Sequence, residues 1–170
     1  MTVRRVSQAA GTTTRAVYSL FGDKEGLLRA LYHDAAEVMR RHHEAVPPHD
    51  DPLVEVTALA LAYRAAAQEQ PHVYGLLMNA TAVGFQATES DRQLAARSFR
   101  RVLAALHRFA DAGHFPGRDP RSIGLQLWAQ VHGLASLELQ GHLGPPEEAE
   151  RRWRDAIGAH IWAYRHPPSP

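Results

Sequence analysis

Residues 12–19 carry side chains that suit contacts with a nucleic acid. The segment reads Thr-Thr-Thr-Arg-Ala-Val-Tyr-Ser. On a helix that begins at this point, the side opposite the apolar residues carries Thr13, Thr14, Arg15, Tyr18 and Ser19. Hydroxyl, guanidinium and phenol groups form hydrogen bonds with phosphate oxygens and with the edges of bases. We therefore expect this side of the helix to bind DNA.

Basic residues are concentrated around the same segment. Through Lys24 the sequence contains four basic residues and one acidic residue, whereas the formal net charge of the whole chain is only +1. The N-terminus of a helix carries positive partial charge and free N–H groups. Thr2, Thr13 and Lys24, at or near predicted helix starts, are therefore candidates for phosphate contacts.

Two short helices are predicted to position these groups. Thr2 can cap the first helix, and Gly11 permits a sharp turn after it. Helical spacing predicts that the second helix turns Ala16, Val17, Leu20 and Phe21 inward. This pattern is typical of a helix-turn-helix, whose second helix enters the major groove of DNA.

The run V-R-R-V-S-Q-A-A-G-T-T-T-R-A-V-Y-S-L-F-G-D-K-E-G-L-L, residues 3–28, resembles the DNA-binding signature of the TetR family of transcriptional regulators. The shared features are an A-G turn, a Y-x-x-F end of the recognition helix and a K-E-x-L-L start of the next helix. The resemblance implies that Tyr18 and Lys24 contact phosphates and that Thr13, Thr14, Arg15 and Ser19 face the groove. Leu20 departs from the family pattern, which commonly has a polar residue there.

Family members carry a further helix ahead of the position of Thr2, and this sequence has none there. We therefore expect Val6, Val17 and Phe21 to lose part of their cover. An upstream start codon, a trimmed chain and a loosely packed N-terminus are three explanations. The alternative to a DNA-binding regulator is accordingly a ligand-binding helical dimer that has lost DNA binding through N-terminal truncation.

The rest of the chain predicts an all-α fold, with the helix-turn-helix followed by an antiparallel helical bundle. Helical patterns cover residues 24–44, 52–70, 71–82, 91–112, 120–141 and 146–165. Because prolines interrupt the chain between Val46 and Pro52, we expect a DNA-binding domain over residues 1–46 and an effector-binding and dimerisation domain over residues 52–166.

Composition argues against several other classes of protein. The sequence of 170 residues has 45% hydrophobic residues and no cysteine. It has no glycine-rich phosphate loop and no apolar run of about 20 residues, so we expect a cytoplasmic protein that is not an enzyme. His42 and His43 are adjacent on a helix and point about 100° apart, so we expect neither a metal nor a cofactor.

The segment W-A-Q-V-H-G-L-A-S-L, Trp128–Leu137, resembles the W-x-x-x-H-G signature of one TetR regulatory-domain subgroup. His132 then lines an effector pocket, or it is a histidine whose hydrogen bonds are satisfied in the core beside a packed tryptophan. We expect an apolar or aromatic effector because the candidate walls are mostly apolar. They are Tyr63, Tyr74, Met78, Phe85, Phe99, Leu106, Trp128 and His132.

In this family the last two long helices of each subunit form a four-helix dimer interface. The resemblance implies that five apolar residues divide between the subunit core and that interface, namely Leu127, Leu134, Trp153, Ile157 and Ile161. A homodimer presents two recognition helices to major grooves about 34–36 Å apart, as a palindromic operator requires. The resemblance thus implies a ligand-responsive repressor, whereas a last helix that only covers its own domain needs no partner.

Overall fold

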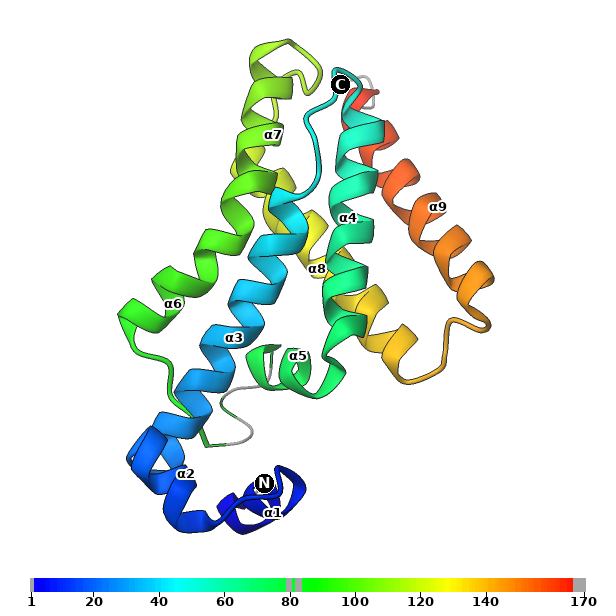
Figure 1. Ribbon diagram of the computed structural model, residues 1–170. Coiled ribbons are helices and arrows are strands. Elements are labelled where there is room, and N and C mark those ends of the chain that lie inside the picture. Colours follow the sequence, from blue (N-terminus) through cyan, green and yellow to red (C-terminus); the bar gives the residue numbers. More distant parts are fainter. Residues whose placement is uncertain (1, 79–80, 82–83, 167–170) are drawn as a thin grey trace.

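The computed structural model describes residues 2–78, 81 and 84–166, and their regular elements are helices (Figure 1). The all-α prediction is therefore confirmed. In chain order the elements are α1 (Val3–Ala9), α2 (Thr14–Phe21), α3 (Lys24–Glu44), α4 (Pro52–Glu69), α5 (Pro71–Met78), α6 (Glu89–Ala96), the 3₁₀ turn η2 (Arg97–Phe99), α7 (Arg100–Asp111), α8 (Pro120–Leu139) and α9 (Pro146–Arg165).

Side-chain caps fix where most helices begin. The Asp23 carboxylate accepts a hydrogen bond from the Gly26 N–H at 2.7 Å, and the Asp51 and Asp119 carboxylates cap α4 and α8. Each cap satisfies an N–H group that has no partner within the helix. The predicted ends of the helix over residues 24–44 are confirmed.

The helix predicted over residues 91–112 is divided in the structure. Thr88 and Asp91 form a reciprocal capping box, so α6 begins at Glu89, and η2 then separates α6 from α7. The helix predicted over residues 71–82 ends at Met78 as α5, and residues 79, 80 and 82 of that prediction lie outside the described residues.

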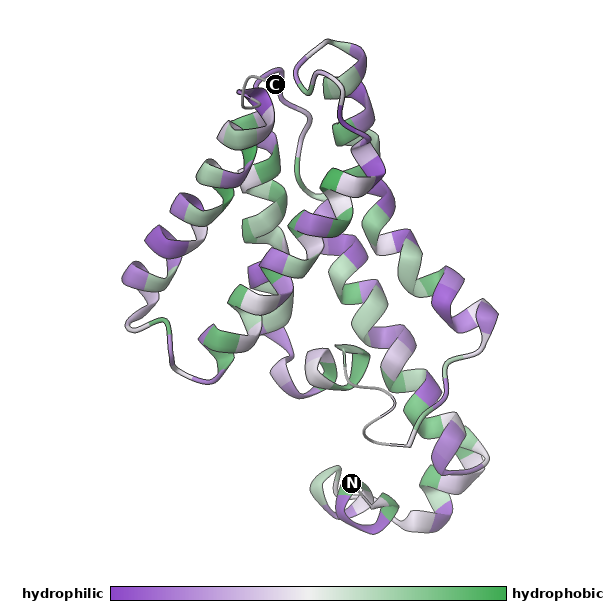
Figure 2. Ribbon diagram, turned by 180° about the vertical axis from the view of Figure 1, so that it is seen from behind, coloured by the Kyte–Doolittle hydropathy of each residue, from purple (hydrophilic) through white to green (hydrophobic). Residues whose placement is uncertain are grey.

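The main core surrounds α4, which lies between α3 and α9 while α8 crosses behind it (Figure 1). The turns of α4 that Figure 2 leaves visible are mostly apolar. Leu59 of α4, Leu106 of α7 and Trp153 of α9 are each at most 2% exposed. Burying a large apolar side chain contributes about 1.5–3 kcal/mol, so this layer holds the helices together.

A second, smaller core joins α1, α2 and the start of α3. It lies at the end of the molecule far from the C-terminal end of α9 (Figure 1). Val3, Val17 and Leu27 are buried there, and Val6 and Phe21 are half-buried at its edge. The predicted inward position of Leu20 is wrong, because the flank of α2 that packs against α1 and α3 is the Val17 flank. Leu20 is 77% exposed.

The helix α3 belongs to both cores. Its 21 residues extend over about 30 Å, from Leu27 in the small core to Met39 and His43 beside the main core. Between them, Leu28 and Tyr32 pack with Leu76 and Phe85 in a middle cluster. None of the described helices combines the length and the apolar character needed to cross a membrane.

Candidate nucleic-acid interface and central cavity

The exposed side of α2 presents the side chains expected to contact DNA. Thr13 caps α2 by accepting a hydrogen bond from the Ala16 N–H at 3.1 Å. Thr14, Arg15 and Ser19 are exposed, and Tyr18 is 48% exposed although it is aromatic. At about 100° per residue, Arg15 and Ser19 lie nearly opposite Val17 on α2, and Thr14 and Tyr18 lie to one side of it.

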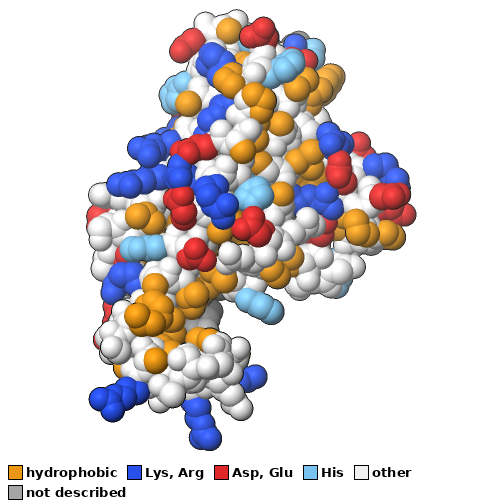
Figure 3. Space-filling view, viewed as in Figure 1, with side chains coloured by type: hydrophobic (Ala, Val, Ile, Leu, Met, Phe, Trp, Pro, Cys, Tyr) orange, Lys and Arg blue, Asp and Glu red, His pale blue; other side chains and the backbone are white. Residues whose placement is uncertain are grey.

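The neighbouring helix starts add polar groups at the same end. Thr2 accepts a hydrogen bond from the Arg5 N–H at 3.4 Å, and Lys24 is exposed in the first turn of α3. Figure 3 shows Lys and Arg side chains projecting from the end of the molecule formed by α1 and α2. Among the described residues neither Arg15 nor Lys24 has an ion-pair partner, so both cations are available to an anion.

A cavity of about 350 Å³ lies between α3, α4, α5, α6 and α8. Its volume is within the range of about 300–1,000 Å³ that is typical of small-molecule sites. A smaller cavity of about 30 Å³, roughly the volume of one water molecule, lies beside it. The two cavities share His43, Tyr63, Phe99 and Trp128.

The predicted wall residues divide between the cavity itself and the layers behind it. Tyr63, Met78, Phe99 and Trp128 line the larger cavity. Tyr74 and His132 lie behind Tyr63 and reach it through hydrogen bonds.

Phe85 and Leu106 are corrections to the predicted wall. Neither residue lines the larger or the smaller cavity, because Phe85 packs in the middle cluster with Tyr32 and Leu106 packs in the main core.

Tyr63, Tyr74 and His132 form a hydrogen-bonded row. The two phenol oxygens are 3.1 Å apart, and the Tyr74 oxygen is 2.8 Å from His132 Nδ1. Burial raises the pKa of Tyr63 well above its usual range, and the neighbouring Tyr74 adds to the effect. The Tyr63 phenol therefore stays neutral and already has a protein partner.

Among the wall residues that the sequence interpretation missed, His43 is a buried titratable group. It is only 4% exposed, and its Nδ1 lies 2.7 Å from the carbonyl oxygen of Ser98. Burial lowers the pKa of His43, so the ring is neutral at pH 7. The available signal was its spacing after Leu28, Tyr32 and Met39, which places a histidine on the inward side of α3.

The predicted interface residues are mostly buried within the protomer itself. Leu127, Trp153, Ile157 and Ile161 are between 0% and 4% exposed, and Leu134 is half-buried against the same core. Of the two locations that the sequence left open, the apolar stripe of α9 occupies the subunit core, because α9 packs along α4. Large apolar side chains that α8 and α9 leave exposed are Leu125, Trp128, Leu137, Leu139 and Trp162.

The helix-turn-helix with an exposed, basic recognition helix, placed at one end of a helical bundle, defines a DNA-binding protein of the regulator class. Comparison with known proteins identifies the family. Residues 1–31 match the model of bacterial regulatory proteins of the tetR family, and residues 56–160 match the tetracyclin repressor-like C-terminal domain. The chain belongs to the TetR family, whose members are DNA-binding transcription regulators and not enzymes.

Solved structures agree in fold. A protein of unknown function from Rhodococcus sp. RHA1 has a TM-score of 0.77 at 22% identity, over 98% of this chain and 86% of that one. PfmR, a TetR family transcriptional regulator from Thermus thermophilus, has a TM-score of 0.78 at 18% identity, over 95% and 88% of the two chains. No curated protein is significantly similar to this chain in sequence.

Proposed function

We propose that this TetR family regulator is a ligand-responsive repressor that binds a palindromic operator as a homodimer. In this proposal residues 1–46 bind DNA and residues 52–166 bind the effector and the second subunit. The observation that carries the proposal is the course of α3, because this one helix begins at a candidate phosphate contact, Lys24, and ends beside the cavity at His43.

The DNA contacts follow from exposure and charge. Thr14, Arg15 and Ser19 are assigned to the major groove, and Tyr18 and Lys24 to phosphates. Thr2 and Thr13 cap helices whose N-termini attract phosphate. We therefore assign these two threonines to contacts with the DNA backbone, like Tyr18 and Lys24.

An ionic clamp supports coupling between the cavity and the DNA-binding end. Asp91 of α6, 2% exposed, lies 2.7 Å from His33 Nε2 and 3.3 Å from Arg29 Nε, and both partners are on α3. The next residue on α6, Arg92, belongs to the cavity wall. A ligand that shifts α6 therefore also acts on α3 near Lys24.

The magnitude required of this coupling is modest. Effectors typically change the affinity at a second site by about 5–150-fold, which corresponds to about 1–3 kcal/mol. Such a change requires the ligand to favour one geometry of α3 over another.

The dimer surface is assigned to the outward sides of α8 and α9. Leu137 is 45% exposed and Trp162 is 63% exposed, whereas the apolar residues on the inward sides are already packed. Contact between two copies would remove such side chains from water. This assignment replaces the inward residues that the sequence pattern suggested.

The DNA assignment is tested with Arg15→Ala and Tyr18→Ala on the DNA upstream of the protein's own gene. We expect each variant to bind at least about tenfold more weakly, since a charge-assisted contact contributes about 1.5–3 kcal/mol. Arg100→Ala is the matched control, because Arg100 is exposed in the first turn of α7, outside both α2 and the helices assigned to the dimer surface. Variants that lose the dimer mass together with DNA binding would show that these residues are structural instead.

A further inference from the structure

In the described part of the chain, the polar groups of the larger cavity are few, and most of them, apart from the Tyr32 hydroxyl and His43 Nε2, are already engaged. The Tyr63 hydroxyl is bonded to Tyr74, and the Ser98 hydroxyl donates to the Ala95 carbonyl at 2.7 Å. The Arg92 guanidinium donates to the Ala87 carbonyl at 2.6 Å and to Glu89. Among the described residues, no carboxylate lines this cavity.

His43 differs from these groups. A carbonyl oxygen only accepts hydrogen bonds, so the contact of Nδ1 with the Ser98 carbonyl requires the proton to be on Nδ1. The neutral ring then carries a lone pair on Nε2. Among the described residues Nε2 has no hydrogen-bond partner, although the side chain is almost completely buried and lines both cavities.

We infer that the cavity selects a neutral, largely apolar ligand with one hydroxyl group, and that this hydroxyl donates to Nε2 of His43. The inference rests on the proposed ligand response and adds the chemical class of the ligand. Nε2 opens onto the cavity with no protein partner among the described residues, so a donor on the ligand can take the place of water there and form a hydrogen bond in largely apolar surroundings. A carboxylate ligand would instead place negative charge against the lone pair, while Arg92, the cation of the described wall, is already bonded.

The size of the cavity sets the size of the ligand. A volume of about 350 Å³ accommodates two fused aromatic rings with one substituent, next to the aromatic faces of Phe99 and Trp128. Three naphthalene probes of nearly equal size therefore separate the possibilities. 2-Naphthol carries a donor, 2-methoxynaphthalene carries an acceptor alone, and 2-naphthoate carries a negative charge.

The test is equilibrium dialysis of the full chain against each probe at pH 7.5. We expect 2-naphthol to bind about tenfold more tightly than 2-methoxynaphthalene, and 2-naphthoate to bind most weakly. In His43→Asn the amide replaces the Nδ1 donor to Ser98 and leaves nothing at the place of Nε2. We expect this variant to lose the preference for 2-naphthol and to keep its affinity for 2-methoxynaphthalene.

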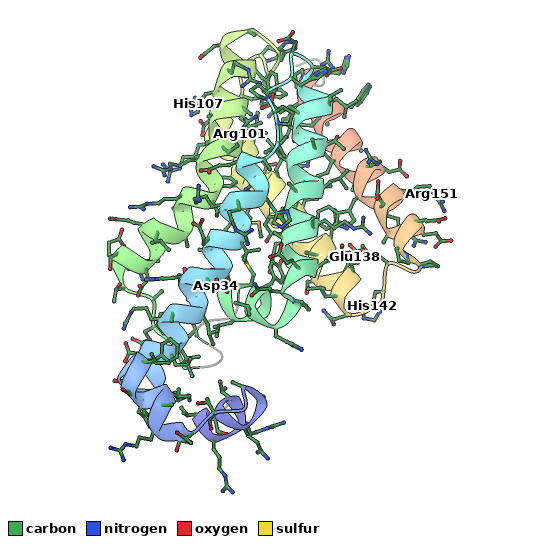
Figure 4. All side chains as sticks on the ribbon, viewed as in Figure 1. Asp34, Arg101, His107, Glu138, His142 and Arg151 are labelled. Carbon is green, nitrogen blue, oxygen red and sulfur yellow. The ribbon has the colours of Figure 1, made fainter. Side chains whose placement is uncertain are left out.

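His107→Asn is the matched control, because His107 projects from the outer side of α7 and is exposed (Figure 4). If His43→Asn does not fold, the inference is tested by NMR on the wild-type protein instead. The ¹⁵N resonance of His43 Nε2 should then move upfield with 2-naphthol and stay in place with 2-methoxynaphthalene.

Equal affinities for the two neutral probes, tighter binding of 2-naphthoate, an unmoved Nε2 resonance or no binding of any probe would each overturn the inference. The proposed function fails in a different way. In that case the probes bind with the expected preference but leave the affinity for DNA unchanged.

Discussion

At the scale of single residues, the protonation of His43 connects the cavity to stability. Burial lowers the pKa of His43 in the folded protein, whereas an unfolded histidine takes up a proton near pH 6.5. Below that pH the unfolded chain therefore binds more protons than the folded one. Linkage then requires the free energy of unfolding to fall as the pH falls.

We predict that urea unfolding of the wild-type protein shows lower stability at pH 5.5 than at pH 6.5, by up to about 1 kcal/mol from His43. His43→Asn should show a smaller decrease. Burial lowers the pKa of His160 as well, and that contribution is common to both proteins. If the stability of the wild-type protein and of His43→Asn decreases equally, the pKa of His43 does not differ between the folded and the unfolded state.

At the scale of helices, Glu138 of α8 joins α4 and α9. Its carboxylate accepts hydrogen bonds from Arg64 at 2.7 Å, from Gln68 at 2.8 Å and from the Trp153 indole N–H at 2.8 Å. The Arg64 and Glu138 side chains are only 11% and 10% exposed. Removing one partner of such a buried pair leaves the other charge unpaired.

We predict that Glu138→Ala lowers the free energy of unfolding by about 3 kcal/mol in urea denaturation, the lower end for a broken buried pair because Arg64 keeps Glu150 and the Pro146 carbonyl. Asp34→Ala on the exposed side of α3 is the control and should change it by no more than about 0.5 kcal/mol (Figure 4). If Glu138→Ala and Asp34→Ala lower the free energy of unfolding equally, Glu138 does not stabilise the packing of α8 with α4 and α9.

Helix limits could be predicted from the sequence better than helix contacts. Asp23 and Asp51 cap their helices through local hydrogen bonds, so a few neighbouring residues suffice to place α3 and α4. In contrast, the stripe of α9 containing Trp153 fits a subunit core or an interface equally well by spacing. Only the packing of α9 along α4 shows that Trp153 is internal.

The candidate sites show the same division. The exposed side of α2 could be predicted because Thr14, Arg15 and Ser19 belong to one continuous segment. The exposure of Leu20 could not, because it depends on which side of α2 packs against α1 and α3. The cavity combines residues from five helices. The residue type alone does not distinguish Phe85 from a wall residue. In the sequence, His43 is considered only as a metal ligand and is set aside because it and His42 point in different directions, as they do on α3.

At the scale of the whole molecule, the proposed function assigns DNA binding to the end formed by α1 and α2 and the dimer surface to α8 and α9, with the cavity between α3, α4, α5, α6 and α8. The helix α3 and the Asp91 clamp connect the DNA-binding end to the cavity. A symmetric pair of such molecules carries two α2 helices related by a twofold axis, and the DNA it recognises should have the same symmetry.

Footprinting of the full chain on the DNA upstream of its own gene, at low salt, tests this central claim most directly. We predict two protected half-sites related by a dyad, in successive major grooves about 34–36 Å apart, with protection that weakens steeply as salt is raised. A fragment that stays unprotected at every protein concentration in low salt would contradict it.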